Sequence, residues 1–335
     1  MPSLSPKENY LRCLRHEDYE YVPFFTIGPA GDAGGAGLFP PDVGDASNGF
    51  VDGFGVHWES SSSAPGGLIP EPGNFILKDI TRWKKDIAIP DVEKYDWEKI
   101  AGDGSGRFPV DRDKAAFAII CNCGPWERLA ALMGFEGAMI AMMEEPEACY
   151  DLLTAVTDYK IALAKKAAHY FKPDTFINFE DIATQRNLFM SPDTYRQLLK
   201  PQHARLNKAV RDMGIIPIQH TCGHAEICVE DYIETGADAW DTVQTSNDIA
   251  ALLDKYGDKF CFEGGFDTNG APGRQDATVE EIVAEVERCF RDYGGKKGYI
   301  FAPYLLLTED TGNVAAKNAA IAETANRLRY NVKIT

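Results

Sequence analysis

Two short apolar runs, Thr175-Phe176-Ile177-Asn178-Phe179 and Ile215-Ile216-Pro217-Ile218-Gln219-His220, flank a helical pattern over residues 192–213. Each run is nearly continuous in apolar residues, which is typical of strands that are buried on both faces. Strands of this kind belong to parallel sheets, in which a helix connects one strand to the next. The segment therefore predicts a β–α–β unit of a parallel sheet.

The same alternation extends in both directions along the chain. Further strands are predicted at 21–27, 115–121, 239–243, 260–263 and 299–302, and helices at 126–143, 146–170, 226–235, 248–256, 278–293 and 312–330. This pattern predicts an α/β fold, specifically a (β/α)8 TIM barrel with an elaborated N-terminal region. An open doubly wound sheet is the alternative, but the Gly-rich phosphate-binding turn expected after its early strands is missing.

We expect a single domain over residues 1–335. Residues 1–113 would supply an N-terminal helix, a first strand and an irregular covering segment, and residues 114–335 the regular β/α repeats. Residues 28–75 are rich in Gly, Pro and Ser, and a loop of this length is usually functional or mobile. Its aromatic residues Phe50, Phe54 and Trp58 either cover an apolar substrate or pack in the core.

The composition is that of a globular protein with an acidic surface. The 335 residues are 44% hydrophobic and 25% charged, and the formal net charge is −17. Because this charge repels phosphate backbones, we expect no nucleic-acid partner. No apolar run approaches the roughly 18–20 residues of a membrane span, and the first residues lack the apolar segment of a secretion signal. We therefore expect no membrane association, a cytoplasmic location and reduced cysteines.

Polar side chains gather where the predicted strands end. Glu180 and Asp181 follow one strand, His220 and Cys222 stand at the end of the next, and Glu263 ends another. In a TIM barrel the active-site groups lie at these carboxyl ends. An imidazole and a thiolate two residues apart can project to the same side, and both are good zinc ligands. A core histidine beside a buried cysteine is the plainer interpretation, and a metal site needs a third ligand from another strand.

Three ordered motifs carry a family resemblance. They are Phe179-Glu180-Asp181-Ile182-Ala183-Thr184-Gln185 with Met190-Ser191-Pro192, then Ile218-Gln219-His220-Thr221-Cys222-Gly223, then Phe262-Glu263-Gly264-Gly265-Phe266-Asp267. In this order and spacing they resemble the uroporphyrinogen decarboxylase superfamily, and within it the cobalamin-dependent methyltransferases, over residues 5–330. The resemblance implies a metal site on His220 and Cys222, because the second motif is similar to the His-x-Cys-Gly motif of the methyltransferase branch.

The chain departs from both branches of that superfamily. Uroporphyrinogen decarboxylases carry an Arg-rich motif after the first strand, whereas residues 27–35 contain no Arg. Members that methylate a thiol have a second Cys after the last strand, whereas Phe301-Ala302-Pro303-Tyr304-Leu305 contains none. The third metal ligand is therefore open. We assign it to Glu180, with Asp181 as an equal candidate by position and Glu263 or Cys261 next.

A carboxylate in place of a thiolate leaves zinc a harder and more electrophilic ion, which suits the polarisation of an ether oxygen. The resemblance then implies a zinc-dependent corrinoid methyltransferase of the O-demethylase type. Such an enzyme moves a methyl group from a methoxylated or otherwise methylated small substrate to the cob(I)alamin of a partner corrinoid protein. The chain lacks the Asp-x-His-x-x-Gly motif of proteins that carry cobalamin themselves, so cobalamin is expected on the partner.

Within this interpretation we expect Asp181 and Tyr304 to be catalytic and Gln219, Glu263 and Asp267 to bind substrate. Three alternatives remain open at this point. They are a methylcobalamin:thiol methyltransferase of the coenzyme M type, a corrinoid-binding or scaffold protein without activity, and a uroporphyrinogen decarboxylase-type decarboxylase. The superfamily resemblance also suggests a homodimer.

Overall fold

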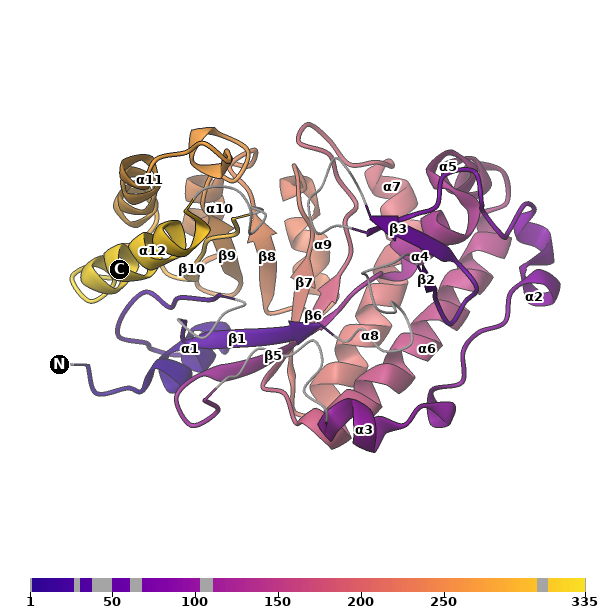
Figure 1. The fold of residues 1–335 in the computed structure, drawn as a ribbon, viewed down its shortest axis with the longest axis horizontal. Coiled ribbons are helices and arrows are strands. Elements are labelled where there is room, and N and C mark those ends of the chain that lie inside the picture. Colours follow the sequence, from indigo (N-terminus) through magenta and orange to yellow (C-terminus); the bar gives the residue numbers. More distant parts are fainter. Residues whose placement is uncertain are drawn as a thin grey trace.

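Seven parallel strands form the central sheet of the computed structural model (Figure 1), which describes residues 2–26, 31–37, 50–60, 68–102, 111–305 and 313–334. Each strand is hydrogen-bonded to the next in the order β1-β5-β6-β7-β8-β9-β10. Their bounds are β1 (Ala33–Gly37), β5 (Ala116–Cys121), β6 (Thr175–Phe179), β7 (Ile216–His220), β8 (Ala239–Val243), β9 (Cys261–Gly265) and β10 (Tyr299–Ala302).

The two edges of this sheet are joined by a short extended segment. Phe24 forms a parallel bridge to Phe301 of β10, and Phe25 forms one to Ala33 of β1. The Phe25 amide donates to the Phe301 carbonyl at 2.9 Å. The sheet is therefore closed in the manner of a TIM barrel, and the predicted α/β barrel is confirmed.

The first two barrel strands differ from the prediction. Among the described residues 21–26 of the predicted strand 21–27, only Phe24 and Phe25 form strand bridges, and Ile27 lies outside the described residues. Strand β1 was not predicted at all, because Ala-Gly-Gly-Ala-Gly contains none of the β-branched or aromatic residues that mark a strand. Pairing with β5 holds this Gly-rich segment extended.

Helices follow the strands and cover the outside of the sheet (Figure 1). Their bounds are α1 (Pro6–Leu14), α2 (Trp83–Asp86), α3 (Trp97–Gly102), α4 (Pro125–Met133), α5 (Phe135–Glu144), α6 (Pro146–Phe171), α7 (Pro192–Thr194), α8 (Lys200–Asp212), α9 (Val229–Glu234), α10 (Ile249–Tyr256), α11 (Val279–Asp292) and α12 (Val314–Leu328). Short 3-10 segments are η1 (Ile80–Arg82), η2 (Val92–Lys94), η4 (Glu226–Cys228) and η5 (Ala271–Gly273), and η3 (Tyr195–Leu199) is a π-helical turn. A capping box of Thr278 and Glu281 begins α11. None of the helices in the described ranges combines the length and apolarity needed to cross a membrane.

The N-terminal helix α1 closes one end of the barrel. Ser5 caps α1 by accepting a hydrogen bond from the Glu8 amide. The apolar side chains of α1, among them Leu11 and Leu14, share one buried cluster with inward residues of the strands such as Ile177 and Ile218. The Lys7 amide donates to the carbonyl of Lys114, just before β5 begins, which places α1 at the N-terminal ends of the strands. The carboxyl ends of the strands lie at the other end of the barrel, away from α1.

A small antiparallel sheet, β2 (Phe50–Val51), β3 (His57–Ser60) and β4 (Leu68–Pro70), lies beside α4 (Figure 1). Asp52 fastens it there, because its carboxylate accepts from Trp58 Nε1 at 2.9 Å and forms a buried ion pair with Arg128 of α4. The Arg128 guanidinium also lies 4.2 Å from the Phe54 ring centroid. Phe54 and Trp58 thus attach this segment to the barrel, and the Phe50 side chain lies outside the described residues.

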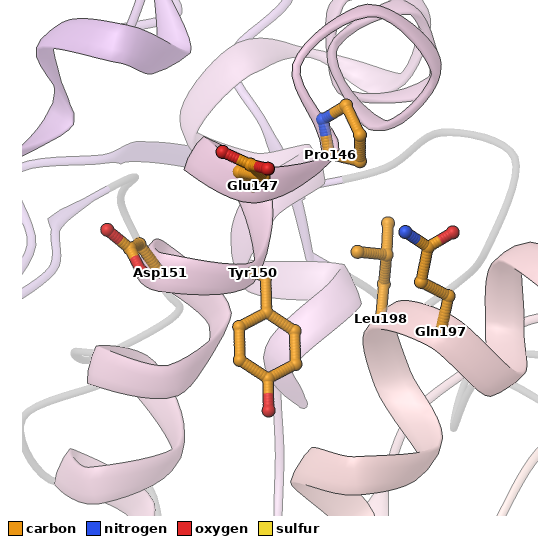
Figure 2. A pocket seen from close by; sticks show the side chains of 6 residues that line it. All are labelled: Pro146, Glu147, Tyr150, Asp151, Gln197 and Leu198. Atoms are coloured by element: carbon orange, nitrogen blue, oxygen red, sulfur yellow. The ribbon is translucent and has the colours of Figure 1, made fainter.

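A surface pocket of about 340 Å³ lies where α6 begins beside η3 (Figure 2). It is lined by Pro146, Glu147, Tyr150, Asp151, Gln197 and Leu198. None of the candidate site residues lines it, so it is separate from the site described next.

Candidate metal centre

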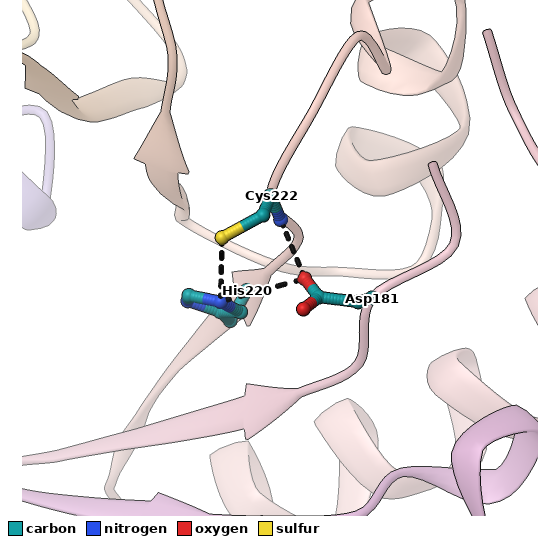
Figure 3. A group of neighbouring side chains, drawn as sticks. All are labelled: Asp181, His220 and Cys222. Carbon is teal, nitrogen blue, oxygen red and sulfur yellow. Dashed lines mark hydrogen bonds and ion pairs between the residues drawn. The ribbon is translucent and has the colours of Figure 1, made fainter. Parts of the chain in front are cut away.

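Three potential metal ligands meet at the carboxyl ends of β6 and β7 (Figure 3). They are Asp181, His220 and Cys222, and their ligand atoms all lie within 4.8 Å of one another. His220 Nε2 is 3.6 Å from Cys222 Sγ and 3.6 Å from Asp181 Oδ1. The trio therefore presents one imidazole nitrogen, one sulfur and one carboxylate oxygen toward a common point.

Two contacts fix the orientation of the His220 ring, one at its Nδ1 atom and one on its flat face. Its Nδ1 lies 2.7 Å from Asp241 Oδ2, and Phe179 stacks on it with ring centroids 3.8 Å apart. A carboxylate on Nδ1 favours the tautomer in which Nε2 has a free lone pair, which is the common arrangement of metal-binding histidines. Asp241 thus orients His220 so that Nε2 faces Cys222 and Asp181.

The backbone around Cys222 fixes the other two ligands. Asp181 Oδ1 accepts a hydrogen bond from the Cys222 amide at 2.7 Å. Gly223 has a φ of 89°, and a Cβ at this position would lie 2.5 Å from the Thr184 carbonyl oxygen. Only glycine allows both this conformation and this close approach, so Gly223 lets the turn after β7 pack against the loop that carries Asp181.

Burial and the neighbouring charges shift both titratable partners. Burial opposes protonation of the His220 ring, but Cys222 and Asp241 outweigh it and raise the pKa of the imidazole well above its ordinary value. For Cys222 the effect of burial has the opposite sign: burial raises the pKa of the thiol, and His220 opposes this shift. Each of the two side chains thus shifts the pKa of the other.

Tyr304 is linked to His220 through Asp241. Its hydroxyl donates to Asp241 Oδ1 at 2.9 Å, and Thr242 Oγ1 donates to the same oxygen at 2.9 Å. Both carboxylate oxygens of Asp241 are therefore hydrogen-bonded, and Asp241 is nearly sealed from solvent. A chain of contacts runs from Tyr304 through Asp241 to His220.

The donor set fits a zinc ion. Zinc takes nitrogen, sulfur and carboxylate oxygen ligands, and a catalytic zinc site keeps three protein ligands and one open position. The trio offers these three donors with the histidine already oriented by a carboxylate. Asp181 is about one third exposed and Cys222 is partly exposed, so the site opens toward the mouth of the barrel.

Glu180, the residue assigned from the sequence as the third ligand, points elsewhere. Its side chain is completely buried and accepts hydrogen bonds from the Trp126 and Glu127 amides at the start of α4. The other carboxylate oxygen contacts His203 Nε2 of α8. Because neighbouring residues along an extended chain point in opposite directions, Asp181 rather than Glu180 lies beside His220.

The structure separates the other expected residues. Gln219 points to the face of β7 opposite His220, where its side chain accepts from Asn178 Nδ2 at 3.1 Å. Asp267 accepts from the Gly270 amide at 2.9 Å and so holds the loop after β9. Cys261 lies deep in the barrel, with its Sγ 3.7 Å from that of Cys13 in α1.

Two carboxylates beside the site were not predicted from the sequence. No sequence motif marks Asp241. Only the pairing of β7 with β8, which places Asp241 beside His220, could have identified it. Glu127 lies on α4, yet its Oε1 accepts from the Asp181 amide at 3.1 Å. Burial, with Asp181 next in importance, raises the pKa of Glu127 to about 8.

The comparison with protein families decides the membership of the chain. The family model for uroporphyrinogen decarboxylase (URO-D) matches residues 113–312, more than half of the sequence. The chain belongs to the URO-D family. The match spans the three sequence motifs and the trio of potential ligands. Among curated protein sequences, none matches the chain significantly.

Solved structures support the same fold. A methyltransferase from Methanosarcina mazei is similar with a TM-score of 0.72 and 14% identity, over 97% of this chain and 99% of that one. D-psicose 3-epimerase from Clostridium cellulolyticum H10 has a TM-score of only 0.38 at 9% identity, over 66% of this chain and 80% of that one. At 14% identity the first similarity shows the barrel fold alone, and the second is too slight to support any argument.

Proposed function

We propose that this URO-D family protein is a zinc-dependent methyltransferase that transfers a methyl group from a methylated small substrate to a corrinoid carried by a partner protein. The observation that carries the proposal is the trio Asp181, His220 and Cys222 at the carboxyl ends of the barrel strands. The fold similarity to a methyltransferase is in keeping with it.

Asp181, His220 and Cys222 would hold the metal. When bound, zinc supplies Lewis acidity to the substrate oxygen that carries the methyl group, and a corrinoid on the partner supplies the methyl acceptor. With a single thiolate among its ligands, the site favours polarisation of an ether oxygen over activation of a thiol.

Asp241 and Asp181 orient the metal ligands, and Tyr304 holds a proton that the reaction needs. Asp241 fixes the His220 tautomer through Nδ1. Burial and Asp241 raise the pKa of the Tyr304 hydroxyl well above its ordinary value, so Tyr304 keeps its proton, which it donates to Asp241 Oδ1 in a hydrogen bond. We propose that Tyr304 gives up this proton to a departing alkoxide or phenolate. Asp181 contributes both a ligand oxygen and an acceptor for the Cys222 amide.

A uroporphyrinogen decarboxylase activity is not proposed despite the family name. The segment 27–35, where decarboxylases carry the Arg residues that hold substrate carboxylates, has none in this chain. A substrate with many carboxylates would also meet a protein with a net charge of −17. Both features oppose a polyanionic substrate.

A methyl-transfer assay with free corrinoid tests the function. Cob(I)alamin is incubated anaerobically with a methoxylated aromatic compound and the zinc-loaded protein, and methylcobalamin is followed by its absorbance. We expect formation with the wild-type protein and with the His224→Ala control, and none with His220→Ala. His224 is the matched control because it lies in the same loop and its Nδ1 is bound to the Ser246 carbonyl instead of the trio. If the protein instead transfers methyl from methylcobalamin to a thiol, and forms no methylcobalamin from the methoxylated compound, methyl transfer runs in the direction opposite to the one proposed.

A further inference from the structure

The corner where α5 ends and α6 begins exposes large apolar side chains. Met143 is 78% exposed, Ile140 is 49% exposed and Tyr150 is 38% exposed. Ile140 and Met143 lie on one face of α5 because they are three residues apart. The buried residues of α5 are also apolar: Ala138, Ala141 and Met142. Since a helix with apolar residues on both faces is normally covered on both, the exposed face of α5 indicates an interaction surface.

The pocket beside this corner adds a recess that a single side chain can fill (Figure 2). Tyr150 lines it from α6 and Leu198 from η3, and these two side chains supply apolar walls. Glu147 and Asp151 add two carboxylates. Asp151 pairs with Lys84 at 2.9 Å, whereas Glu147 has no ion-pair partner among the described residues. A Lys or Arg side chain can pack its hydrocarbon stem on the apolar walls and bring its charge to Glu147.

The charge around the corner restricts the kind of partner. Residues 129–159 contain six Asp and Glu residues and no Lys, Arg or His. A second copy of this chain would place the same carboxylates opposite these, and nucleic acid or an anionic membrane would add phosphates. Like charges across an interface oppose association, whereas a basic surface is attracted. The corner therefore favours a basic segment of another protein.

We propose that the α5–α6 corner is a docking surface for a partner protein whose contacting segment combines apolar side chains with a Lys or Arg. The apolar side chains cover Ile140 and Met143, and the basic side chain enters the pocket beside Glu147. Amphipathic helices commonly bind other proteins in this way, with their apolar face laid on an apolar surface. The corner is separate from the candidate metal centre, and the proposal does not depend on the proposed function.

Peptide binding to the full-length protein tests the docking surface. The probes are two fluorescently labelled amphipathic helical peptides of about 14 residues. One is built of Leu and Lys, and the other has Glu in place of every Lys. Fluorescence anisotropy gives the two dissociation constants. We expect the wild-type protein to bind the Leu/Lys peptide at least about 10-fold more tightly than the Leu/Glu peptide.

Two double variants show whether the peptide binds at the α5–α6 corner. Met143→Ser, Glu147→Gln removes an exposed apolar side chain and a carboxylate of the pocket, and should weaken Leu/Lys binding by about 10-fold. Ile227→Ser, Glu280→Gln is the matched control, because it makes the same kinds of change and the same change in net charge at exposed residues of η4 and α11. We expect this control to bind within about 2-fold of the wild type.

Equal losses in the two double variants would overturn the proposal, because the peptide would then respond to net charge alone. Equal binding of the two peptides, or no binding of either, would overturn it as well. A wild-type protein that sediments as a dimer, and becomes a monomer only in Met143→Ser, Glu147→Gln, would assign the corner to a second copy of the chain instead. None of these measurements involves zinc or methyl transfer, so their outcome leaves the proposed function to its own test.

Discussion

The Nδ1 atom of His220 and the Oδ2 atom of Asp241 lie 2.7 Å apart, on adjacent strands whose register places the two residues side by side. This contact leaves Nε2 as the only ring nitrogen that faces Cys222 and Asp181. The orientation of the central ligand is therefore set by the barrel itself before any cation arrives.

Replacing Asp241 tests this orientation. Because a carboxylate partner fixes the histidine tautomer and raises its basicity, Asp241→Asn should weaken zinc binding by about 10–100-fold. Competition with a fluorescent zinc chelator measures the affinity. Asp267→Asn is the control, since that carboxylate accepts from the Gly270 amide and the Thr245 hydroxyl, in the loops after β9 and β8. An affinity unchanged from the wild type would show that Asp241 does not act through His220.

Tyr304→Phe separates proton donation from metal binding. The variant loses the phenol O–H that donates to Asp241 Oδ1, while Thr242 still donates to the same oxygen. We expect zinc affinity within about 2-fold of the wild type and a methyl-transfer rate lower by about 10²-fold, the low end of general acid catalysis. If the rate and the zinc affinity fall in parallel, Tyr304 serves only to hold Asp241.

Glu180 and Asp181 should respond in opposite ways to substitution. Glu180→Ala leaves the buried His203 and two amides of α4 without an acceptor, so we expect a loss of about 3–5 kcal/mol in unfolding free energy with zinc stoichiometry retained. Asp181→Ala removes a partly exposed ligand and should lose zinc with little change in the apo-protein's unfolding temperature. If folded Glu180→Ala loses zinc while Asp181→Ala keeps it, the third metal ligand is Glu180 and not Asp181.

Gly223→Ala should destabilise the turn that carries Cys222. The residue has a positive φ, and the added methyl group would meet the Thr184 carbonyl at 2.5 Å. We expect a loss of about 1–3 kcal/mol, measured by denaturant unfolding. Gly214→Ala is the matched control, because Gly214 also has a positive φ but a Cβ added there would meet nothing within 4 Å. Equal losses in the two variants would mean that the contact with Thr184 is unimportant.

The regular part of the barrel is readable from the sequence because its strands are continuous apolar runs. The strands 175–179 and 239–243 were predicted within their observed bounds, and 215–220 differs by one residue from β7. The first two extended segments of the barrel, Phe24-Phe25 and β1, cannot be predicted in this way. Pairing with β5 alone keeps the Gly-rich β1 extended, and two bridging residues close the sheet.

The site is readable where its members are close in sequence. The spacing of His220 and Cys222 indicates a shared site, since side chains two residues apart at a strand end project to one side. Which of Glu180 and Asp181 faces His220 depends on the path of the chain after β6. The amides at the start of α4 bind the Glu180 carboxylate, and Asp181 is the residue left beside His220. Asp241 reaches His220 only through the register of two strands, which no local pattern reveals.

The zinc content of the purified protein is the first test of a metal centre on His220 and Cys222. Elemental analysis is carried out on the wild type, on the His220→Ala, Cys222→Ala double variant and on the His224→Ala control, all prepared without chelators. We expect about one zinc per chain in the wild type and in the control, and none in the folded double variant. A wild-type protein that lacks zinc and does not take it up from solution, or a double variant that retains zinc, would rule out a metal centre on these residues.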